Sequence, residues 1–335
     1  MLVRRETQAS LCPCEESTMT VPTPNSGMNQ PPARRSTPRT IAPLSVAALS
    51  GENMLRFPLD QAQLERVVAG ALTEDGAHND LTTIATILSD RRARATVVAK
   101  EAGVIAGIPL ALEAFRQLDG KVSIRVDLED GTPVGTGTPV LFVTGHARAI
   151  LSAERVALNF LQRLSGVASL TSRFVEAVKG TRARILDTRK TTPGWRQLEK
   201  YAVRAGGGMN HRQDLAAAVL IKDNHLSALD GDVGLAVRRA RDLVPDGIKV
   251  EIECDTLAQV RAAIDARADI ILLDNMSPAK MGEAVQMVEG RAIVEASGGV
   301  TIDTVRQIAD TGVDWISVGA LTHSAKALDL GLDFE

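Results

Sequence analysis

The segment Leu186-Asp187-Thr188-Arg189-Lys190-Thr191-Thr192-Pro193-Gly194 marks a point where a buried strand is expected to end. An apolar run with β-branched character, residues 183–186, leads into it, and two adjacent cations and a turn sequence follow. Buried strands end in this way where the chain emerges at a working surface. The segment therefore predicts a strand that carries cationic side chains to a site.

Five later segments repeat this pattern of a short apolar run followed by polar residues or glycine. The runs cover residues 219–221, 248–250, 270–273, 292–294 and 315–317. They lead into Lys222 to His225, Glu251 to Glu253, Asp274-Asn275, Glu295 to Gly299 and Val318 to Ala320. Helical patterns separate the runs, as in a parallel α/β barrel, where the carboxyl ends of the strands converge on the face that carries the site.

Composition narrows the class of protein. A chain of 335 residues with 44% hydrophobic and 24% charged residues is typical of a globular protein of one or two domains. The net charge of −3 gives no long-range electrostatic attraction to nucleic acid or to a membrane, so any affinity for anions must come from a local cluster of cations. Cys12, Cys14 and Cys254 form no disulfide framework, and no segment is long enough to span a membrane. We therefore expect a cytoplasmic protein.

The chain divides into regions of different composition. Seven of the 14 prolines lie within the first 43 residues, so residues 1–55 are predicted to be a disordered extension. Residues 56–160 predict a small, mostly antiparallel α/β domain, with helices over 59–72 and 110–118. Residues 161–321 contain most of the barrel pattern. Residues 322–335 are a C-terminal tail that we expect to pack back on the first domain.

One long helix is predicted over residues 152–178. Its apolar residues recur at steps of three and four, from Val156 through Phe160 and Leu164 to Val178. Arg155 lies off this stripe, and taken alone it is best interpreted as a surface arginine.

A glycine triplet, Gly206-Gly207-Gly208, precedes His211 and Arg212. Consecutive glycines destabilise regular structure and allow close approach of the backbone. Together with Arg189, Lys190 and Lys222, these two residues would place five cationic or cation-capable side chains on one face of the barrel. Such a cluster is stable when it shares anionic ligands, and planar guanidinium groups suit carboxylates and phosphates.

Acidic and glycine-rich strand ends extend the predicted site. Glu251 and Asp274 either neutralise the cations or face a sugar, a developing cation or a divalent metal. Ser297-Gly298-Gly299 and Val318-Gly319-Ala320 end the last two strands, where such barrels bind phosphate. No nucleophile is evident, since Cys254 lies within a strand. These features favour a reaction in which one substrate attacks another, such as transfer of a phosphorylated sugar.

The ordered motifs resemble those of the quinolinate phosphoribosyltransferase family. The resemblance runs from about residue 56 to the end of the chain. It rests on residues 188–194, 198–203, 206–212, 221–225, 272–275, 295–299 and 317–324. It implies an N-terminal α/β sandwich domain followed by an open parallel α/β barrel, and a homodimer whose active sites are completed across the interface.

By this resemblance the chain would convert quinolinate and phosphoribosyl pyrophosphate to nicotinate mononucleotide, pyrophosphate and CO2 in NAD biosynthesis, with Mg2+ as cofactor. Arg155 would reach in from the partner subunit. Quinolinate would contact Arg189, His211, Arg212 and Lys222, while Lys190 would lie near the carboxylate and pyrophosphate groups. Glu251 and Asp274 would face the ribose and its magnesium, directly or through water, and with Lys190 they would be the catalytic residues. The sugar phosphate would contact Thr188, Lys190, Lys222, Ser297, Gly298, Gly299, Val318, Gly319 and Ala320.

Two other interpretations remain open at this point. One is a transferase of the same fold that acts on another aromatic acid. The other is a non-catalytic barrel that binds sugar phosphates, which would not need both Glu251 and Asp274. The paired arginines and His211 favour a dicarboxylate over a monocarboxylate.

Overall fold

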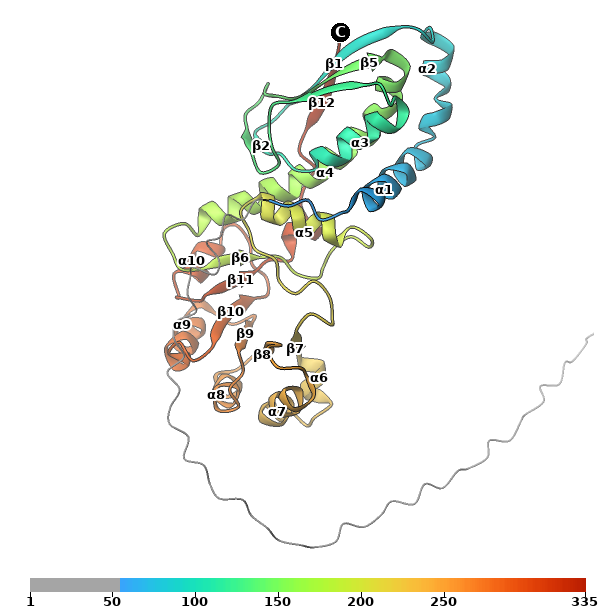
Figure 1. Cartoon of the computed structure of the whole chain (residues 1–335). Coiled ribbons are helices and arrows are strands. Elements are labelled where there is room, and N and C mark those ends of the chain that lie inside the picture. The colour runs from blue at the N-terminus through green and yellow to red at the C-terminus, as the bar shows by residue number, and fades with distance from the viewer. Residues whose placement is uncertain (1–54) are drawn as a thin grey trace, which may run out of the picture. The chain divides into compact units, whose positions relative to one another are not determined.

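Residues 55–335 are described by the computed structural model (Figure 1). The extension predicted to be disordered, with Cys12 and Cys14, lies outside the described residues apart from Leu55. No helix within residues 55–335 is both long enough and apolar enough to cross a membrane.

An antiparallel sheet of four strands forms the N-terminal domain, in the order β12-β1-β5-β3. Its strands are β1 (Arg92–Ala99), β3 (Ser123–Val126), β5 (Pro139–His146) and β12 (Leu330–Phe334). Alternate residues of β1 are buried, because successive side chains of a strand point to opposite faces. β12 belongs to the C-terminal tail and pairs with β1, so the end of the chain completes the first domain.

Helix α4 (Ala147–Ala177) contacts strands β1, β5 and β12 of this sheet, and helices α1 (Gln61–Glu74) and α3 (Ile108–Leu118) pack against α4 and each other. The short elements are η2 (Ala77–Asn79), α2 (Leu81–Thr86), β2 (Gly103–Val104) and β4 (Pro133–Val134), of which β2 and β4 pair.

The long helix α4 buries the predicted apolar stripe, including Val156, Phe160 and Leu164. It begins five residues earlier than predicted, because Ala147 and Ile150 are also buried and extend the stripe.

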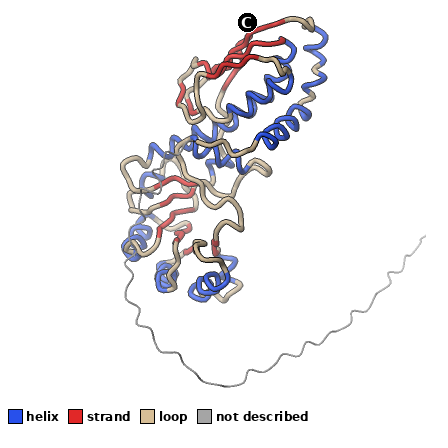
Figure 2. The backbone as a smooth tube through the Cα atoms, viewed as in Figure 1, coloured by secondary structure: helices blue, strands red, loops and turns tan. Residues whose placement is uncertain are grey.

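Six parallel strands form the second sheet, in the order β6-β11-β10-β9-β8-β7. They are β6 (Arg184–Leu186), β7 (Val219–Ile221), β8 (Val250–Cys254), β9 (Ile270–Asp274), β10 (Ile293–Ser297) and β11 (Trp315–Ser317). Consecutive strands β6 and β7 lie at opposite ends of this order, so the barrel is open between them. The strands of both sheets are red in Figure 2. The prediction of an α/β fold with about six parallel strands is confirmed.

Helices separate these strands along the chain. They are α5 (Arg196–Ala205), α6 (Asp223–Ser227), α7 (Val233–Leu243), α8 (Leu257–Asp265), α9 (Pro278–Val288) and α10 (Val305–Ala309), with α11 (Ala320–His323) after β11.

The glycine triplet lets the chain run along the open edge of β6. Met209 pairs with Leu186 in a single parallel bridge, and its N–H donates to the Ile185 carbonyl at 2.8 Å. A Cβ at Gly206 would lie 2.3 Å from the Ala168 carbonyl oxygen on α4. The close backbone approach that the glycines predicted is thus an approach to α4, and the backbone then carries Asn210 and His211 to the carboxyl end of β6.

Gly166 on α4 makes a similar close approach possible for the C-terminal tail. A Cβ at this position would lie 2.0 Å from the Lys326 carbonyl oxygen. We expect Gly166→Ala to destabilise the protein by about 1–3 kcal/mol through overpacking and to lower Tm by several degrees. Thermal unfolding monitored by circular dichroism measures the change.

Gly282→Ala on α9 is the matched control, because no atom lies within 4 Å of the added Cβ. A helix gains about 0.5–1 kcal/mol from such a change, so Tm should stay level or rise. Similar Tm values for the two variants would contradict the close approach at Gly166.

Candidate active site

The carboxyl ends of the six parallel strands bring most of the predicted residues to one edge of the sheet. Thr188, Arg189 and Lys190 follow β6, and Lys222 follows β7. Asp274 and Ser297 are the last residues of β9 and β10, and Val318 follows β11. Glu251 differs from its prediction: it is the second residue of β8 and not a residue after the strand. The strand runs from Val250 to Cys254, and all of its residues are buried, both glutamates included.

Asp187 is fully buried at the end of β6 and holds the loop that carries His211. Its carboxylate accepts hydrogen bonds from Lys200 on α5, from the Asn210 side chain and from the His211 N–H at 2.9 Å. Lys200 also donates to the His211 carbonyl at 3.0 Å. Burial raises the pKa of Asp187 and lowers that of Lys200, and their ion pair opposes both shifts. These contacts fix the backbone of Asn210 and His211 relative to β6.

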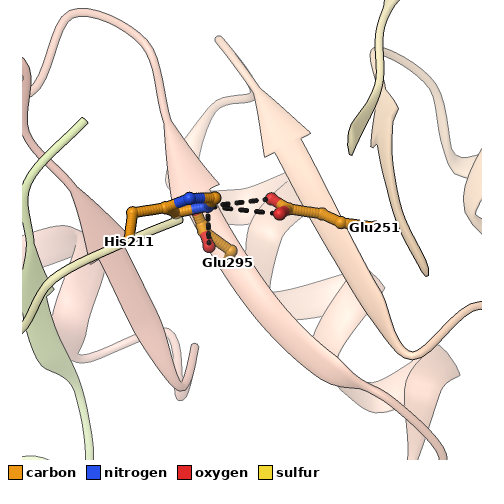
Figure 3. Close-up of side chains that lie close together, drawn as sticks. All are labelled: His211, Glu251 and Glu295. Atoms are coloured by element: carbon orange, nitrogen blue, oxygen red, sulfur yellow. Dashed lines mark hydrogen bonds and ion pairs between the residues drawn. The ribbon is translucent and has the colours of Figure 1, made fainter. Parts of the chain in front are cut away.

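His211 lies between two buried glutamates, Glu251 on β8 and Glu295 on β10 (Figure 3). Its Nε2 is 3.2 Å from Glu251 Oε2 and 3.5 Å from Glu295 Oε2. Ser317 on β11 donates to the other oxygen of Glu295. The imidazole thus joins three strands of the barrel through the loop that follows α5.

The protonation of this cluster follows from its contacts. Burial lowers the pKa of His211, but the two glutamates outweigh this effect and raise it to about 10. Burial and the nearby Glu295 raise the pKa of Glu251. The raised pKa of His211 favours the doubly protonated ring, with a proton on Nδ1 as well as on Nε2. The Arg212 N–H donates to Nδ1 at 2.8 Å, which requires the neutral ring with Nδ1 as an acceptor. Nε2 carries a proton in either state, so its donation to Glu251 does not depend on which state prevails.

Ligand atoms of His211, Glu251 and Glu295 lie within 4.8 Å of one another, a spacing that a metal ion could bridge. A metal ion would have to displace the Nε2 proton that already joins His211 to Glu251. The geometry therefore favours a hydrogen-bonded cluster that fixes Glu251 over a metal centre at these three residues.

The predicted cations have few protein counter-charges. Within residues 55–335, no carboxylate lies at ion-pair distance from Arg189, Lys190, Arg212 or Arg155. The Arg189 Nε is buried and makes no hydrogen bond to any described residue. Burial and the adjacent Arg189 lower the pKa of Arg212, as expected for neighbouring guanidinium groups that repel each other. Such an uncompensated group of cations suits an anionic ligand.

Lys222 departs from this pattern. Its Nζ pairs with Glu253 Oε2 at 2.7 Å, so its charge is already balanced by the protein.

The glycine-rich strand ends pack closely against neighbouring residues. Gly298 has φ +92°, and a Cβ there would lie 2.2 Å from Asn275 Oδ1, so only glycine fits. A Cβ at Gly319 would lie 3.1 Å from Lys190 Cδ, which places the stem of Lys190 beside the 318–320 loop. Asp274 accepts a hydrogen bond from the Asn275 side chain at 2.7 Å and has no cationic partner among the described residues. Gly299 (φ +59°) and Ala320, the first residue of α11, complete these loops.

Arg155 lies apart from this group. It is exposed on α4, and no described hydrogen bond or ion pair joins it to the strand ends. Thr188 is near the cations in sequence, but its hydroxyl accepts the Lys190 N–H at 3.1 Å and so helps to shape the loop.

Several residues that shape the site received no role from the sequence. Asp187, Glu199, Lys200 and Glu295 are all buried and charged. A signal existed for one pair, since Glu199 and Lys200 are opposite charges next to each other in a helix with apolar neighbours. Their partners Asn210, Thr192 and Arg163 are distant enough in sequence that spacing alone does not connect them.

Comparison with known proteins agrees with this geometry. The family pattern of the quinolinate phosphoribosyl transferase C-terminal domain matches residues 167–333, and that of the N-terminal domain matches residues 80–165.

The matches to individual relatives cover most of this chain and most of each relative. A nicotinate-nucleotide pyrophosphorylase [carboxylating] from Mycobacterium leprae is 44% identical over 78% of this chain and 94% of its own length. A probable enzyme of the same name from Bacillus subtilis is 40% identical over 82% of this chain and 94% of its own. The solved nicotinate-nucleotide pyrophosphorylase from Francisella tularensis is 37% identical with a TM-score of 0.78, over 84% of this chain and 99% of its own. From these matches and the two-domain fold, the chain belongs to the quinolinate phosphoribosyltransferase family.

Proposed function

We propose that this chain catalyses the decarboxylating transfer of the phosphoribosyl group of phosphoribosyl pyrophosphate to quinolinate. The products are nicotinate mononucleotide, pyrophosphate and CO2, and the reaction supplies NAD biosynthesis. The observation that supports this most strongly is the group of unpaired cations, Arg189, Lys190 and Arg212, at the strand ends of a barrel of this family. Relatives that share about 40% of the sequence over most of its length bear the name of this activity.

The two arginines suit the two ring carboxylates of quinolinate. Arg189 is close enough to Arg212 to lower the pKa of Arg212, and neither arginine has a carboxylate partner among residues 55–335. Each planar guanidinium can donate two parallel hydrogen bonds to a carboxylate. Both nitrogens of His211 are engaged within the protein, so we assign this residue to holding Glu251. Lys222 would contact substrate only by sharing or leaving Glu253.

The chemistry needs no protein nucleophile. The unprotonated ring nitrogen of quinolinate attacks the anomeric carbon of the sugar, and the bond to pyrophosphate breaks with its electron pair leaving on pyrophosphate. The sugar gains cationic character on the way, which the buried carboxylate of Glu251 stabilises electrostatically. The ring nitrogen is then quaternary and draws electrons, so the adjacent carboxylate leaves as CO2 and the ring carbon takes a proton from solvent. Positioning of the two substrates contributes much of the rate.

Magnesium fits the acidic side of this site through Asp274. The ion prefers oxygen ligands and commonly binds one or two carboxylates together with substrate phosphates. Asp274 has a carboxylate without a cationic partner among the described residues, whereas Glu251 is bonded to His211 and would act on the ion only through water. When bound, the ion would neutralise charge on the leaving pyrophosphate. Lys190 would contribute a second positive charge there.

The 5-phosphate of the sugar would occupy the loops that end β10 and β11. Gly298 and Gly299 have positive φ and expose backbone amides without a side chain in the way. Gly319 lies against Lys190, so phosphate and pyrophosphate groups would be bound on adjacent parts of one surface. Ser297, Val318 and Ala320 complete this part of the site.

A homodimer would supply the remaining charge, Arg155. This residue is exposed and unpaired on α4, one turn after Ser152, which donates to Asp80 at the start of α2. Leu81 and Ile84 on α2 and the nearby Leu88 are exposed apolar residues, with Leu81 80% exposed. An apolar stripe beside a free arginine is well suited to a second copy of the chain whose own site lacks that charge.

We infer that the protein is located in the cytoplasm. The only cysteine among the described residues, Cys254, is buried and free, as is common in a reducing compartment. Relatives from rice and tobacco bear chloroplastic and mitochondrial names.

The direct test is incubation with quinolinate, phosphoribosyl pyrophosphate and magnesium. We expect nicotinate mononucleotide and CO2 to appear in equal amounts, as measured by chromatography and by release of label from [2-carboxyl-14C]quinolinate. Nicotinate in place of quinolinate should give little product, because it lacks the second carboxylate. Turnover of nicotinate at a rate equal to that of quinolinate, or no turnover of either, would contradict the proposal.

Arg155 should act in the site of the partner subunit. Arg155→Ala and Arg212→Ala are each expected to be inactive alone. Mixed under conditions that allow subunit exchange, they should recover about a quarter of wild-type activity, since hybrid dimers carry one intact site of two. Each variant taken alone through the same exchange is the control. Demonstrated exchange without recovery would show that the sites are not shared.

A further inference from the structure

Helix α5 carries two buried charges in succession, Glu199 and Lys200, that contact different loops of the site. Glu199 is 0% exposed and Lys200 2% exposed. Burial of a charge is costly unless it is paired and hydrogen-bonded, so each of these residues must be satisfied by its surroundings. Their partners lie on different loops, and each set of partners ends at a different group of the candidate site.

Glu199 holds the loop that carries Lys190. Its carboxylate accepts the Thr192 N–H at 3.0 Å and the Thr192 hydroxyl at 2.9 Å. It also pairs with Arg163 on α4, which donates to the carbonyl oxygen of Thr322. The Thr322 hydroxyl in turn donates to the Lys190 carbonyl at 2.7 Å. Lys190 is therefore held from both sides by contacts that lead back to Glu199.

Lys200 holds the loop that carries His211 and Arg212. It pairs with Asp187 and donates to the His211 carbonyl at 3.0 Å. Asp187 accepts the His211 N–H at 2.9 Å and the side-chain amide of Asn210. Arg212 follows directly, and its own N–H donates to the imidazole of His211. The placement of Arg212 thus depends on the Lys200 contacts, together with the hydrogen bond that its own Nη1 donates to the Ala218 carbonyl at 3.0 Å.

We propose that Glu199 and Lys200 are positioning residues for different substrates, Glu199 for phosphoribosyl pyrophosphate through Lys190 and Lys200 for quinolinate through Arg212. This inference rests on the proposed function for the identity of the two substrates. The hydrogen bonds of Glu199 and Lys200 do not depend on that function, so their effect on the two loops can be tested without any substrate.

The substrate test compares Glu199→Gln with Lys200→Met. Glu199→Gln should weaken use of phosphoribosyl pyrophosphate about 10- to 100-fold in kcat/KM, a typical effect of slight misplacement, and should change the KM for quinolinate less than about threefold. Lys200→Met should have the reverse selectivity. Both are measured with the other substrate saturating, and binding titrations with each substrate check the KM values.

Tyr201→Phe is the matched control from the next position of the same helix. Tyr201 is buried, and its hydroxyl donates at 2.6 Å to Asp130, which lies outside the site. Its loss should lower Tm and leave both KM values unchanged. Equal weakening of both substrates by Glu199→Gln and Lys200→Met would reduce the pair to general structural support and overturn the inference, as would no effect on either.

Milder variants carry the test if the loss of a buried charge prevents folding. Thr192→Val removes one hydroxyl that reaches Glu199, Thr192→Ser restores it, and Asn210→Ala removes one donor to Asp187. Thr192→Val should affect phosphoribosyl pyrophosphate, Thr192→Ser should recover, and Asn210→Ala should affect quinolinate.

Amide hydrogen exchange separates this inference from the proposed function. Glu199→Gln should speed exchange at Thr192, and Lys200→Met at His211, because these N–H groups lose their acceptor or its support. Inactivity of the wild-type chain would contradict the proposed function and leave the exchange result standing. Exchange that rises equally at both amides in both variants would contradict the positioning roles whatever the activity.

Discussion

The buried ion pair between Asp187 and Lys200 is the interaction on which the rest of the site depends. Breaking such a pair by removing one partner costs about 3–5 kcal/mol, because a charge is left without compensation in the interior. The pair is located where the barrel is open, at the edge of β6 that no further strand covers. Asp187 satisfies this edge by drawing in the loop after the glycine triplet, and the same contacts place His211 and Arg212. The contacts that satisfy the open edge of β6 therefore also assemble this part of the site.

Charges are distributed unevenly around this pair. The acidic groups near the strand ends are buried and joined to protein partners, with Glu251 and Glu295 on His211 and Glu253 on Lys222. Arg189, Lys190 and Arg212 have no such partner among residues 55–335. A protein does not gain stability by gathering cations that repel each other, so the arrangement is explained by anionic substrates that complete it. Asp274, at the end of β9, has no cationic partner among the described residues and so remains available for a cation.

Much of this structure could be predicted from strand ends. The apolar runs at residues 183–186 and 270–273 identified β6 and β9, and the polar residues after them identified the edge that carries the site. The glycine triplet correctly indicated a close backbone approach. The bounds of β8 were predicted wrongly. The strand is buried on both faces and contains Glu251 and Glu253, so no apolar run marks where it ends. The role of Glu295 could not be predicted, since it depends on contacts with His211 and Ser317, which lie on other elements. Where Arg155 acts depends on a second copy of the chain, so neither this sequence nor this chain's own contacts locate it.

The central claim is that the unpaired arginines exist to bind the two carboxylates of quinolinate. Arg212→Ala tests it most directly, through two binding titrations, one with quinolinate and one with phosphoribosyl pyrophosphate. Charge-assisted hydrogen bonds contribute about 1.5–3 kcal/mol each, so quinolinate affinity should fall on the order of 100-fold, at tenfold per 1.36 kcal/mol. Arg212→Lys keeps the charge but loses the planar fork, and it should recover little. Affinity for phosphoribosyl pyrophosphate should change far less. Equal weakening of both ligands, or unchanged binding of quinolinate, would contradict the account.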